Sequence, residues 1–423
     1  MLTKSFILFF ISSAVWGNAV DGIALPVVGT LFPLRIAVIV YAIIIWYKTF
    51  VLGEYIEVLP ESSRIHKKLH KTSIVAFTAM MIAGFVTMYW AYNKIFVVID
   101  IVTWITSFLC VAMCVTTLKT KDDVIFASRV FIVNFLIIGG IGIYESFTGD
   151  YFNLTYDYYT RHKNIFDMYM PASIMFNINN LAIFMVLSMP ICFVGTEGLK
   201  GKQFWDFCLM VFGEVVAVLT GCNTALVIFC VVFLMYVYLN REKKSTGVII
   251  VVVIMILIAL SSIVVGVFNE ILSFAIEDEP RLDLWKNAFG VAKKYWFMGV
   301  GPGNSETVNV LYRTVNVAET ARAHNYFLTI FEEFGIVGFA FFAWWFVKFI
   351  YATFKIHGMA KNTPVKYGVM FIVTFLPSTL CMSSMIGYFY YWAEIGIFVA
   401  MMGIVENKTE DFNQYLDSNR LDS

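Results

Sequence analysis

Long apolar runs alternate with short polar breaks along the whole chain. About twelve of these runs come close to the roughly 20 apolar residues that a helix needs to cross a membrane. They predict spans near 4–20, 34–53, 73–92, 95–116, 127–147, 170–194, 204–219, 224–239, 246–268, 330–354, 366–386 and 388–405. We therefore expect an all-α, polytopic membrane protein, in which residues 1–423 form a single integral membrane domain.

Lysine and arginine are distributed unevenly over the polar breaks. Alternate breaks carry most of them, with a cluster at 64–71, whereas the short breaks of the other set hold little beyond Lys94. Cytoplasmic loops are enriched in these residues, so both termini are predicted to be cytoplasmic. The bias also supports a division of one long apolar run at 220–224, because otherwise the later basic loops would face outward. Residues 406–423 would be a polar cytoplasmic tail without regular structure.

Two longer polar segments are predicted to face outward, 148–169 and 269–324, the second of them between the ninth and tenth spans. In the second segment, Pro280 can begin a helix directly after three acidic residues. Apolar residues then recur at helical spacing, and lysines and Arg281 occupy much of the remaining surface. This pattern predicts an amphipathic helix at the membrane surface, which either anchors the loop or presents cations to an anionic lipid-linked ligand.

Composition agrees with a membrane location. The chain is 60% hydrophobic and 14% charged, whereas soluble domains are about 25% charged. A formal net charge of zero gives no indication of nucleic-acid binding. The seven cysteines lie in or at the ends of apolar runs and form no CxxC or Cys/His cluster. The outward segments show no acidic cluster with clear metal-ligand spacing, and the nearest group, Glu277–Glu279, is interpreted as the start of a helix. This agrees with the reaction without metal or cofactor that the family resemblance given below implies.

The candidate chemistry lies at the start of the tenth span. His324 is one of five histidines and stands in a segment that also contains Arg281 and Arg322. Arg161 lies in the other outward segment. A histidine at this depth can be a simple interfacial residue. However, neutral histidine accepts a proton near neutral pH and arginine binds phosphate in a forked geometry, so together they suit transfer of a group from a diphosphate to a hydroxyl.

Three stretches carry a resemblance to a known family. In His324–Gly338 (HNYFLTIFEEFGIVG), ten residues separate the histidine from Gly335. Arg281–Gly303 begins with arginine and ends in Gly-x-Gly-x-Gly, and Met175–Phe184 (MFNINNLAIF) is an asparagine-rich start of a span. Glu145, before TGD, fits a further common position. The chain thus resembles the O-antigen ligase/polymerase superfamily of bacterial envelope glycosyltransferases.

The resemblance implies a GT-C-type membrane glycosyltransferase in the bacterial inner membrane. Its donor would be an undecaprenyl-diphosphate-linked glycan, and its acceptor either another lipid-linked repeat unit, in a polymerase, or lipid A core, in a ligase. His324 would be the catalytic base. The diphosphate-binding residues would be Arg281, Arg322 and Arg161, and the supporting residues Asn325, Gly335, Glu145, Asn177 and Asn179. Membrane lipids, a chain-length regulator and a flippase are the other implied partners, and nucleic acid is not one.

One position departs from the family. Where its members often have Ser-Arg-Thr, this chain has Cys222–Thr224 (CNT), so Asn223 replaces an arginine that helps to hold the lipid diphosphate in ligases. This difference favours a polymerase over a ligase and leaves Arg161 or Arg322 as a substitute. A lipid-linked glycan flippase and a membrane scaffold are the rival classes. The absence of visible internal repeats argues against the first, and the grouped arginines and histidine argue against the second.

Ionisable residues also lie inside predicted spans. Asp100, Glu214 and Glu394 are examples, and such residues usually face a cavity or a partner. Glu332 and Glu333 follow His324 on the tenth span, and we expect them to pair with cations of the outward segment.

Overall fold

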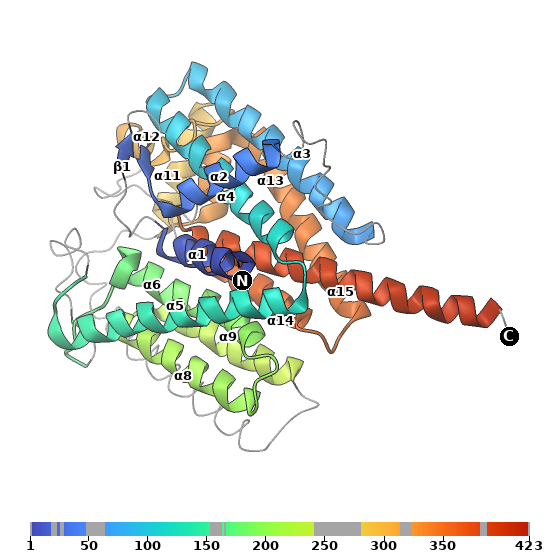
Figure 1. Cartoon of the computed structure of the whole chain (residues 1–423). Coiled ribbons are helices and arrows are strands. Elements are labelled where there is room, and N and C mark those ends of the chain that lie inside the picture. Colours follow the sequence, from blue (N-terminus) through green and yellow to red (C-terminus); the bar gives the residue numbers. More distant parts are fainter. Residues whose placement is uncertain are drawn as a thin grey trace. The chain divides into compact units, whose positions relative to one another are not determined.

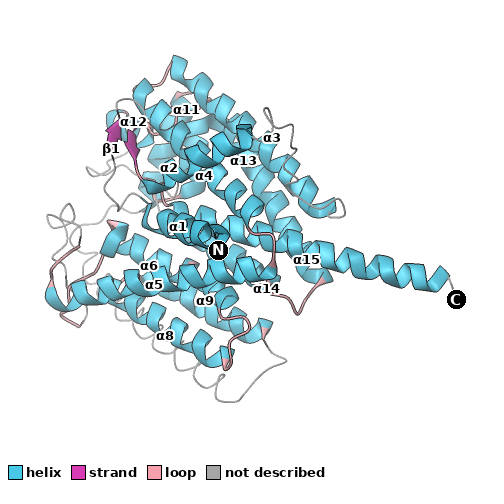
Figure 2. Cartoon of the chain, viewed as in Figure 1, coloured by secondary structure: helices cyan, strands magenta, loops and turns pink. Residues whose placement is uncertain are grey.

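The computed structural model describes residues 2–17, 23–25, 29–47, 64–152, 163–164, 166–240, 281–313, 323–380 and 387–421. Helices dominate this part of the chain (Figures 1 and 2). The helices are α1 (Leu2–Trp16), α2 (Pro33–Trp46), α3 (Arg64–Val86), α4 (Lys94–Thr117), α5 (Lys121–Thr148), α6 (Ile178–Leu187), α7 (Met189–Gly195), α8 (Lys202–Thr220), α9 (Asn223–Leu239), α11 (Arg281–Lys294), α12 (Ser305–Leu311), α13 (Tyr326–Met359), α14 (Val365–Ser378) and α15 (Phe389–Leu421). The strands β1 (Ile23–Leu25) and β2 (Gly29–Leu31) form one antiparallel hairpin. The predicted helical class is confirmed for these residues, apart from that hairpin.

Six helices of the described part are long and apolar enough to cross a membrane. They are Ile65–Tyr89, Lys94–Thr117, Lys121–Thr148, Lys202–Thr220, Tyr326–Met359 and Phe389–Lys408. The pair α6 and α7, bent by 40°, adds a seventh if it is one span, and four shorter apolar helices lie at other predicted spans. The chain is therefore a multi-pass membrane protein. The total of about twelve spans stays a prediction, because the run 246–268 lies outside the described residues.

The C-terminal tail differs from expectation. Residues 406–421 continue α15 as a helix, although their polar composition predicted an irregular segment. The first part of this extension has a packing role, because the Glu406 carboxylate accepts hydrogen bonds from the backbone N–H groups of Ile65 (2.7 Å) and His66 (2.9 Å). An acidic side chain at a helix N-terminus satisfies N–H groups that have no partner within the helix. Glu406 thus ties α15 to the start of α3.

The chain divides into two compact units. Unit 1 comprises 1–124, 279–365 and 383–423, and unit 2 comprises 125–278 and 366–382. In unit 1, α3 packs along α13 and α4 packs along α15, while α11 and α12 lie against α13 (Figure 1). In unit 2, α6 packs against α8 and α9.

Aromatic side chains fill the centre of unit 1. Phe77 of α3 meets Trp345 of α13 with ring centroids 4.9 Å apart, in an edge-to-face arrangement. Trp104 of α4 and Trp392 of α15 meet in the same manner at 5.8 Å. Because edge-to-face pairs bring the positive ring edge against the negative ring face, they add to the gain from apolar burial. One cluster thereby joins four helices.

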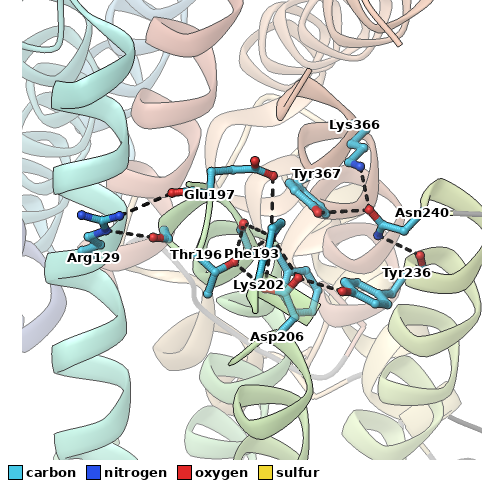
Figure 3. A network of polar contacts seen from close by, with 11 residues as sticks. Arg129, Phe193, Thr196, Glu197, Lys202, Asp206, Tyr236, Asn240, Lys366 and Tyr367 are labelled. Atoms are coloured by element: carbon cyan, nitrogen blue, oxygen red, sulfur yellow. Dashed lines mark hydrogen bonds and ion pairs between the residues drawn. The ribbon is translucent and has the colours of Figure 1, made fainter. Parts of the chain in front are cut away.

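A polar network joins the helices of unit 2 (Figure 3). Its centre is Asp206 of α8, a fully buried side chain that accepts hydrogen bonds from Thr196, from Lys202 (2.9 Å) and from the Tyr236 hydroxyl of α9 (2.7 Å). Lys202 also donates to the carbonyl of Phe193 in α7, at 2.8 Å. A buried carboxylate is tolerated when it is paired and hydrogen-bonded in this way. The network therefore stabilises the packing of α7, α8 and α9.

The same network extends to α5 and α14. The Arg129 Nε donates to the carbonyl of Gly195 at 3.1 Å, which ties α5 to the end of α7. Lys366 of α14 donates to the Asn240 side-chain oxygen at 2.7 Å, and Asn240 in turn donates to the carbonyl of Tyr236 at 2.9 Å. Five helices of unit 2 are thus held at one end by polar contacts.

Asp206→Ala tests how much this network contributes. It leaves Lys202 and the Tyr236 hydroxyl without their carboxylate, and breaking a buried ion pair from one side costs about 3 kcal/mol or more. We expect a clear fall in the Tm of the detergent-solubilised protein, followed by tryptophan fluorescence. Lys200→Ala, at an exposed position next to the network, serves as the control and should leave the Tm unchanged. An Asp206→Ala protein as stable as the control would contradict a central role for this carboxylate.

Candidate functional site

The helix that follows His324 is broken inside the membrane-crossing part. α13 keeps helical backbone angles except at Gly335, where φ is 68° and ψ is −176°. A side chain is disfavoured at this positive φ, and glycine adopts it readily. A Cβ at Gly335 would also lie 2.5 Å from the carbonyl carbon of Met298. Glycine therefore permits both the break and the close approach of another chain segment.

The segment that enters the break leads into the glycine loop (Gly299–Asn304, GVGPGN). Val300 and Gly301 donate their N–H groups to the carbonyls of Glu332 (2.9 Å) and Glu333 (3.0 Å). On the other side of the break, Ile336 donates to the carbonyl of Phe297 at 2.9 Å. These contacts replace hydrogen bonds that the helix loses at Gly335, so no backbone group of this set is left unpaired. The glycine-rich turn thus completes the backbone hydrogen bonding of α13.

The side chains of the two glutamates bind the same region. The Glu333 Oε1 accepts from the Ser305 hydroxyl at 2.7 Å, and the Glu332 Oε2 accepts from the Asn309 Nδ2 at 3.1 Å. Both partners lie on α12. The sequence suggested pairing with outer-loop cations. The described contacts are with neutral side chains, while Arg322 and the side chain of Arg281 lie outside the described part of the structure. Both partners offer hydrogen-bond donors, and a carboxylate can only accept hydrogen bonds.

His324 lies just before α13, at a strained backbone position. Its φ is 45°, which is uncommon for a residue with a side chain. The next residue, Asn325, is the N-cap of α13, and its side-chain oxygen accepts from the Leu328 N–H at 3.1 Å. The histidine ring is half-buried. Strain of this kind persists only where the surrounding structure imposes it, and it is frequent at functional sites.

A direct hydrogen bond connects α11 to the position before His324. The Trp285 Nε1 donates to the carbonyl of Ala323 at 2.7 Å. Arg281 begins α11, four residues before Trp285, and residues four apart share a helix face. The predicted amphipathic helix is therefore present, and Trp285 ties it to the residue before His324.

Aromatic residues indicate that this region lies at a membrane boundary. Tyr89 and Trp296 are 89% and 85% exposed, and such side chains are enriched where membrane meets water. The Trp90 indole donates to the carbonyl of Gly299 at 2.7 Å, and the Asn93 N–H donates to the side chain of Asn304 at 2.8 Å. The turn between α3 and α4 and the glycine loop therefore lie at the same end of unit 1.

The predicted supporting residues of unit 2 organise its outward segment. Glu145 is fully buried, and its carboxylate accepts from the N–H groups of Phe152 (2.9 Å), Ala172 (2.9 Å) and Ser173 (2.7 Å). Its carboxylate therefore links the two ends of the segment between α5 and α6.

The start of α6 has its own local support. Asn177 is the N-cap of α6 and accepts from the Asn179 N–H at 2.8 Å, so Asn179 lies in the first turn. Nearby, the Asn164 amide donates to the carbonyl of Leu219 at 3.0 Å, which brings the outward segment close to the break that contains Asn223. These contacts show structural roles for Asn177 and Asn164 that the sequence pattern did not predict.

The described residues bring together only part of the predicted site. His324, Asn325, Gly335 and the start of α11 belong to unit 1, whereas Glu145, Asn177 and Asn179 belong to unit 2. Arg161 and Arg322 lie outside the described residues. Trp285 lies on the predicted amphipathic helix, but its contact with Ala323 could not be foreseen, because a tryptophan on an apolar face indicates only packing. Within the described ranges, no group of three or more His, Cys, Asp or Glu side chains could hold a metal ion.

These features define a class of protein: a multi-pass membrane protein with a histidine at the start of a broken helix and an arginine-led surface helix beside it. Residues 208–343, which include all of α9, α11 and α12 and the start of α13, match the family model described as O-antigen ligase. The match supports placing the chain in the O-antigen ligase/polymerase superfamily, as the sequence motifs predicted. Among curated proteins, none matches the chain.

Gly335→Ala tests the importance of the break in α13. A side chain at this φ costs about 1–2 kcal/mol, and its Cβ overlaps the Met298 backbone. We expect a markedly lower Tm in detergent. The matched control is Gly358→Ala on the same helix, where a Cβ meets nothing within 4 Å and alanine favours the helix by about 1 kcal/mol. Equal Tm values for the two variants would show that α13 does not need this break.

Proposed function

We propose that the protein is a polysaccharide polymerase of the bacterial inner membrane, which joins undecaprenyl-diphosphate-linked repeat units into a surface glycan such as O-antigen or capsule. The family match over 208–343 supports a glycosyl-transfer function. The observation that carries the proposal further is the hydrogen bond from Trp285 to Ala323. It ties α11, the helix that begins with the cationic residue Arg281, to the residue before His324, which can accept a proton.

In this proposal His324 is the catalytic base. It removes the proton from the acceptor sugar hydroxyl while the oxygen attacks the anomeric carbon of the donor glycan. The bond from that carbon to the lipid diphosphate breaks, and the negative charge grows on the departing diphosphate. Arg281 stabilises this charge, with Arg322 and Arg161 as further diphosphate-binding residues. The lipid diphosphate is already an activated leaving group, so the reaction as written uses no cofactor.

The supporting residues have positioning roles. Asn325 caps α13 and so fixes the backbone that carries His324, and Gly335 permits the break that admits the glycine loop. Glu145, Asn177 and Asn179 order the outward segment of unit 2. We assign to that segment a part in binding the glycan, because it carries Arg161.

An O-antigen ligase is the second candidate. It would use the same donor and the same base, but it would transfer the glycan to lipid A core or another final acceptor. The family description favours this reading. Asn223, at the first position of α9, favours the polymerase, because ligases often have an arginine there. A lipid-linked glycan flippase is the candidate of another class, and it would need no proton acceptor at position 324.

Complementation of a strain of the source bacterium that lacks this gene tests the proposal. We expect wild type to restore a ladder of long surface glycan on a gel, whereas His324→Ala and Arg281→Ala leave single repeat units at equal membrane levels. Loss of one well-placed base typically costs about 10²–10⁴-fold in rate. Lys293→Ala, an exposed residue of the same helix α11, is the control and should behave as wild type.

The other outcomes of this assay separate the candidates. Long glycan that is no longer joined to its final anchor would identify a ligase. Glycan units trapped on the cytoplasmic face would identify a flippase. Normal glycan with His324→Ala would show that the histidine is only an interfacial residue and would overturn the proposed mechanism.

Trp285→Phe tests the contact that links α11 to His324. Phenylalanine keeps the apolar ring but removes the donor to Ala323, so the position of His324 should loosen while the fold persists. A neutral hydrogen bond contributes about 1 kcal/mol. We therefore expect a roughly five- to tenfold fall in glycan elongation rate in isolated membranes, with an unchanged Tm. An elongation rate equal to that of wild type would argue against this contact as a positioning element.

A further inference from the structure

Glu332 and Glu333 occupy an unusual place for charged residues. Both are buried, with exposed fractions of 0% and 8%, inside a helix long and apolar enough to cross a membrane. Acidic side chains at such depth are costly and are typically retained for a function. The proposed glycosyl transfer does not use either carboxylate directly.

Each glutamate binds the outer-loop segment twice, once through its backbone and once through its side chain. The Glu332 carbonyl accepts from Val300 and its carboxylate accepts from Asn309. The Glu333 carbonyl accepts from Gly301 and its carboxylate accepts from Ser305. Two consecutive residues of α13 thus hold the segment from Val300 to Asn309 at four points.

The carbonyl contacts exist only because α13 is broken. In an unbroken helix the carbonyl of residue i accepts from residue i+4, and the non-helical backbone at Gly335 interrupts that pattern. The freed carbonyls of Glu332 and Glu333 are therefore available to the glycine loop. Their carboxylates then reach past the loop to α12.

A continuous set of hydrogen bonds leads from these glutamates toward His324. Asn309, which donates to Glu332, accepts from the Asn287 amide of α11 through its side-chain oxygen (3.1 Å) and its carbonyl (3.2 Å). Asn287 is itself buried, with an exposed fraction of 1%. Two residues earlier on α11, Trp285 donates to Ala323. The glutamates therefore fix α12, α12 fixes α11, and α11 fixes the residue before His324.

We infer that Glu332 and Glu333 are positioning residues for the reaction at His324, because they clamp α12 and α11 to the broken part of α13. This inference rests on the proposed function. The clamp holds α11, which begins with Arg281, at one place relative to the histidine. A displacement of the charged group or of the base by about 1 Å is enough to cost on the order of 100-fold in rate.

The chemistry of the clamp requires carboxylates. The groups that hydrogen-bond to the two side chains are donors: the Ser305 hydroxyl, the Asn309 amide and backbone N–H groups of Gly303 and Ser305 at Glu333. The Asp100 carboxyl of α4 also lies near Glu333. A carboxylate offers only acceptors, whereas a glutamine turns an NH₂ group toward some of these donors. Glu333→Gln and Glu332→Gln therefore keep size and shape but disturb the clamp.

The experiment uses the full-length protein purified in lipid nanodiscs, with lipid-linked repeat units extracted from the source strain as the substrate. Glu333→Gln and Ser305→Ala remove the two ends of one contact. We expect each to lower kcat about tenfold, as for a hydrogen bond to a charged group, with little change in KM. The double variant should be no worse than either single variant, because both remove the same contact. Ser305→Thr keeps a hydroxyl, so its kcat should lie within about threefold of the wild-type value. This loss is smaller than the one expected for Ser305→Ala, which removes the contact.

Hydrogen–deuterium exchange supplies a readout that does not depend on activity. In Glu333→Gln and Glu332→Gln, the amides of 299–311 and of α11 should exchange faster, while α4 and α15 keep wild-type protection. Lys293→Gln, an exposed change on α11, is the control and should alter neither exchange nor kcat.

Two results would overturn the inference. The first is wild-type kcat and wild-type exchange in both glutamate variants. The second is a lower Tm with normal kcat per folded molecule, which would make the glutamates purely stabilising. If wild-type protein itself transfers no glycan in this assay, the proposed function fails, and faster exchange in the variants would then establish the clamp without a link to glycosyl transfer.

Discussion

Backbone hydrogen bonding at the break in α13 is the constraint on which the site in unit 1 depends. Water cannot satisfy exposed N–H and C=O groups inside a membrane, so a broken helix is tolerated only where other groups pair with it. The glycine loop supplies Val300 and Gly301 on one side of the break, and Phe297, just before the loop, pairs with the other side. The loop can approach only because glycines stand at 299 and 335, where added Cβ atoms would lie 2.5 Å from the facing backbone. The glycine loop and the broken helix α13 thus satisfy each other's backbone hydrogen-bonding groups.

The arrangement of the site follows from that pairing. Once the glycine loop is held in the break, α12 follows it directly, and its polar residues reach the buried glutamates. α11 precedes the loop. Its Asn287 contacts Asn309 of α12, and its Trp285 contacts Ala323, just before α13. Local interactions then fix His324, whose unusual φ is held between this contact and the cap formed by Asn325. The residue proposed as the catalytic base is in this way supported by rigid elements on both sides.

Unit 2 shows the same principle with different groups. Buried acids again act as acceptors for several donors: Asp206 for Thr196, Lys202 and Tyr236, and Glu145 for three backbone N–H groups. In both units, acids inside apolar helices organise loops and helix ends. The sequence analysis gave Glu332 and Glu333 cationic partners because charge complementarity is the simplest expectation for a buried acid. The contacts that the described residues make with these carboxylates come instead from the neutral side chains of Asn309 and Ser305.

The sequence by itself determined the membrane class, the position of most helices, the amphipathic α11 and the family motifs around His324. These features depend on hydrophobic periodicity and on local residue order, which act over one or a few helical turns. Only the tertiary structure decided the function of Gly335 and the glycine loop, the neutral partners of the glutamates and the contact between Trp285 and Ala323. The helical ending of the chain was likewise not foreseen, because polar residues at a terminus lack the apolar periodicity that predicts a helix. Such features arise from pairing between segments far apart in the chain, and the donors and acceptors that meet there carry no periodic signal in the sequence.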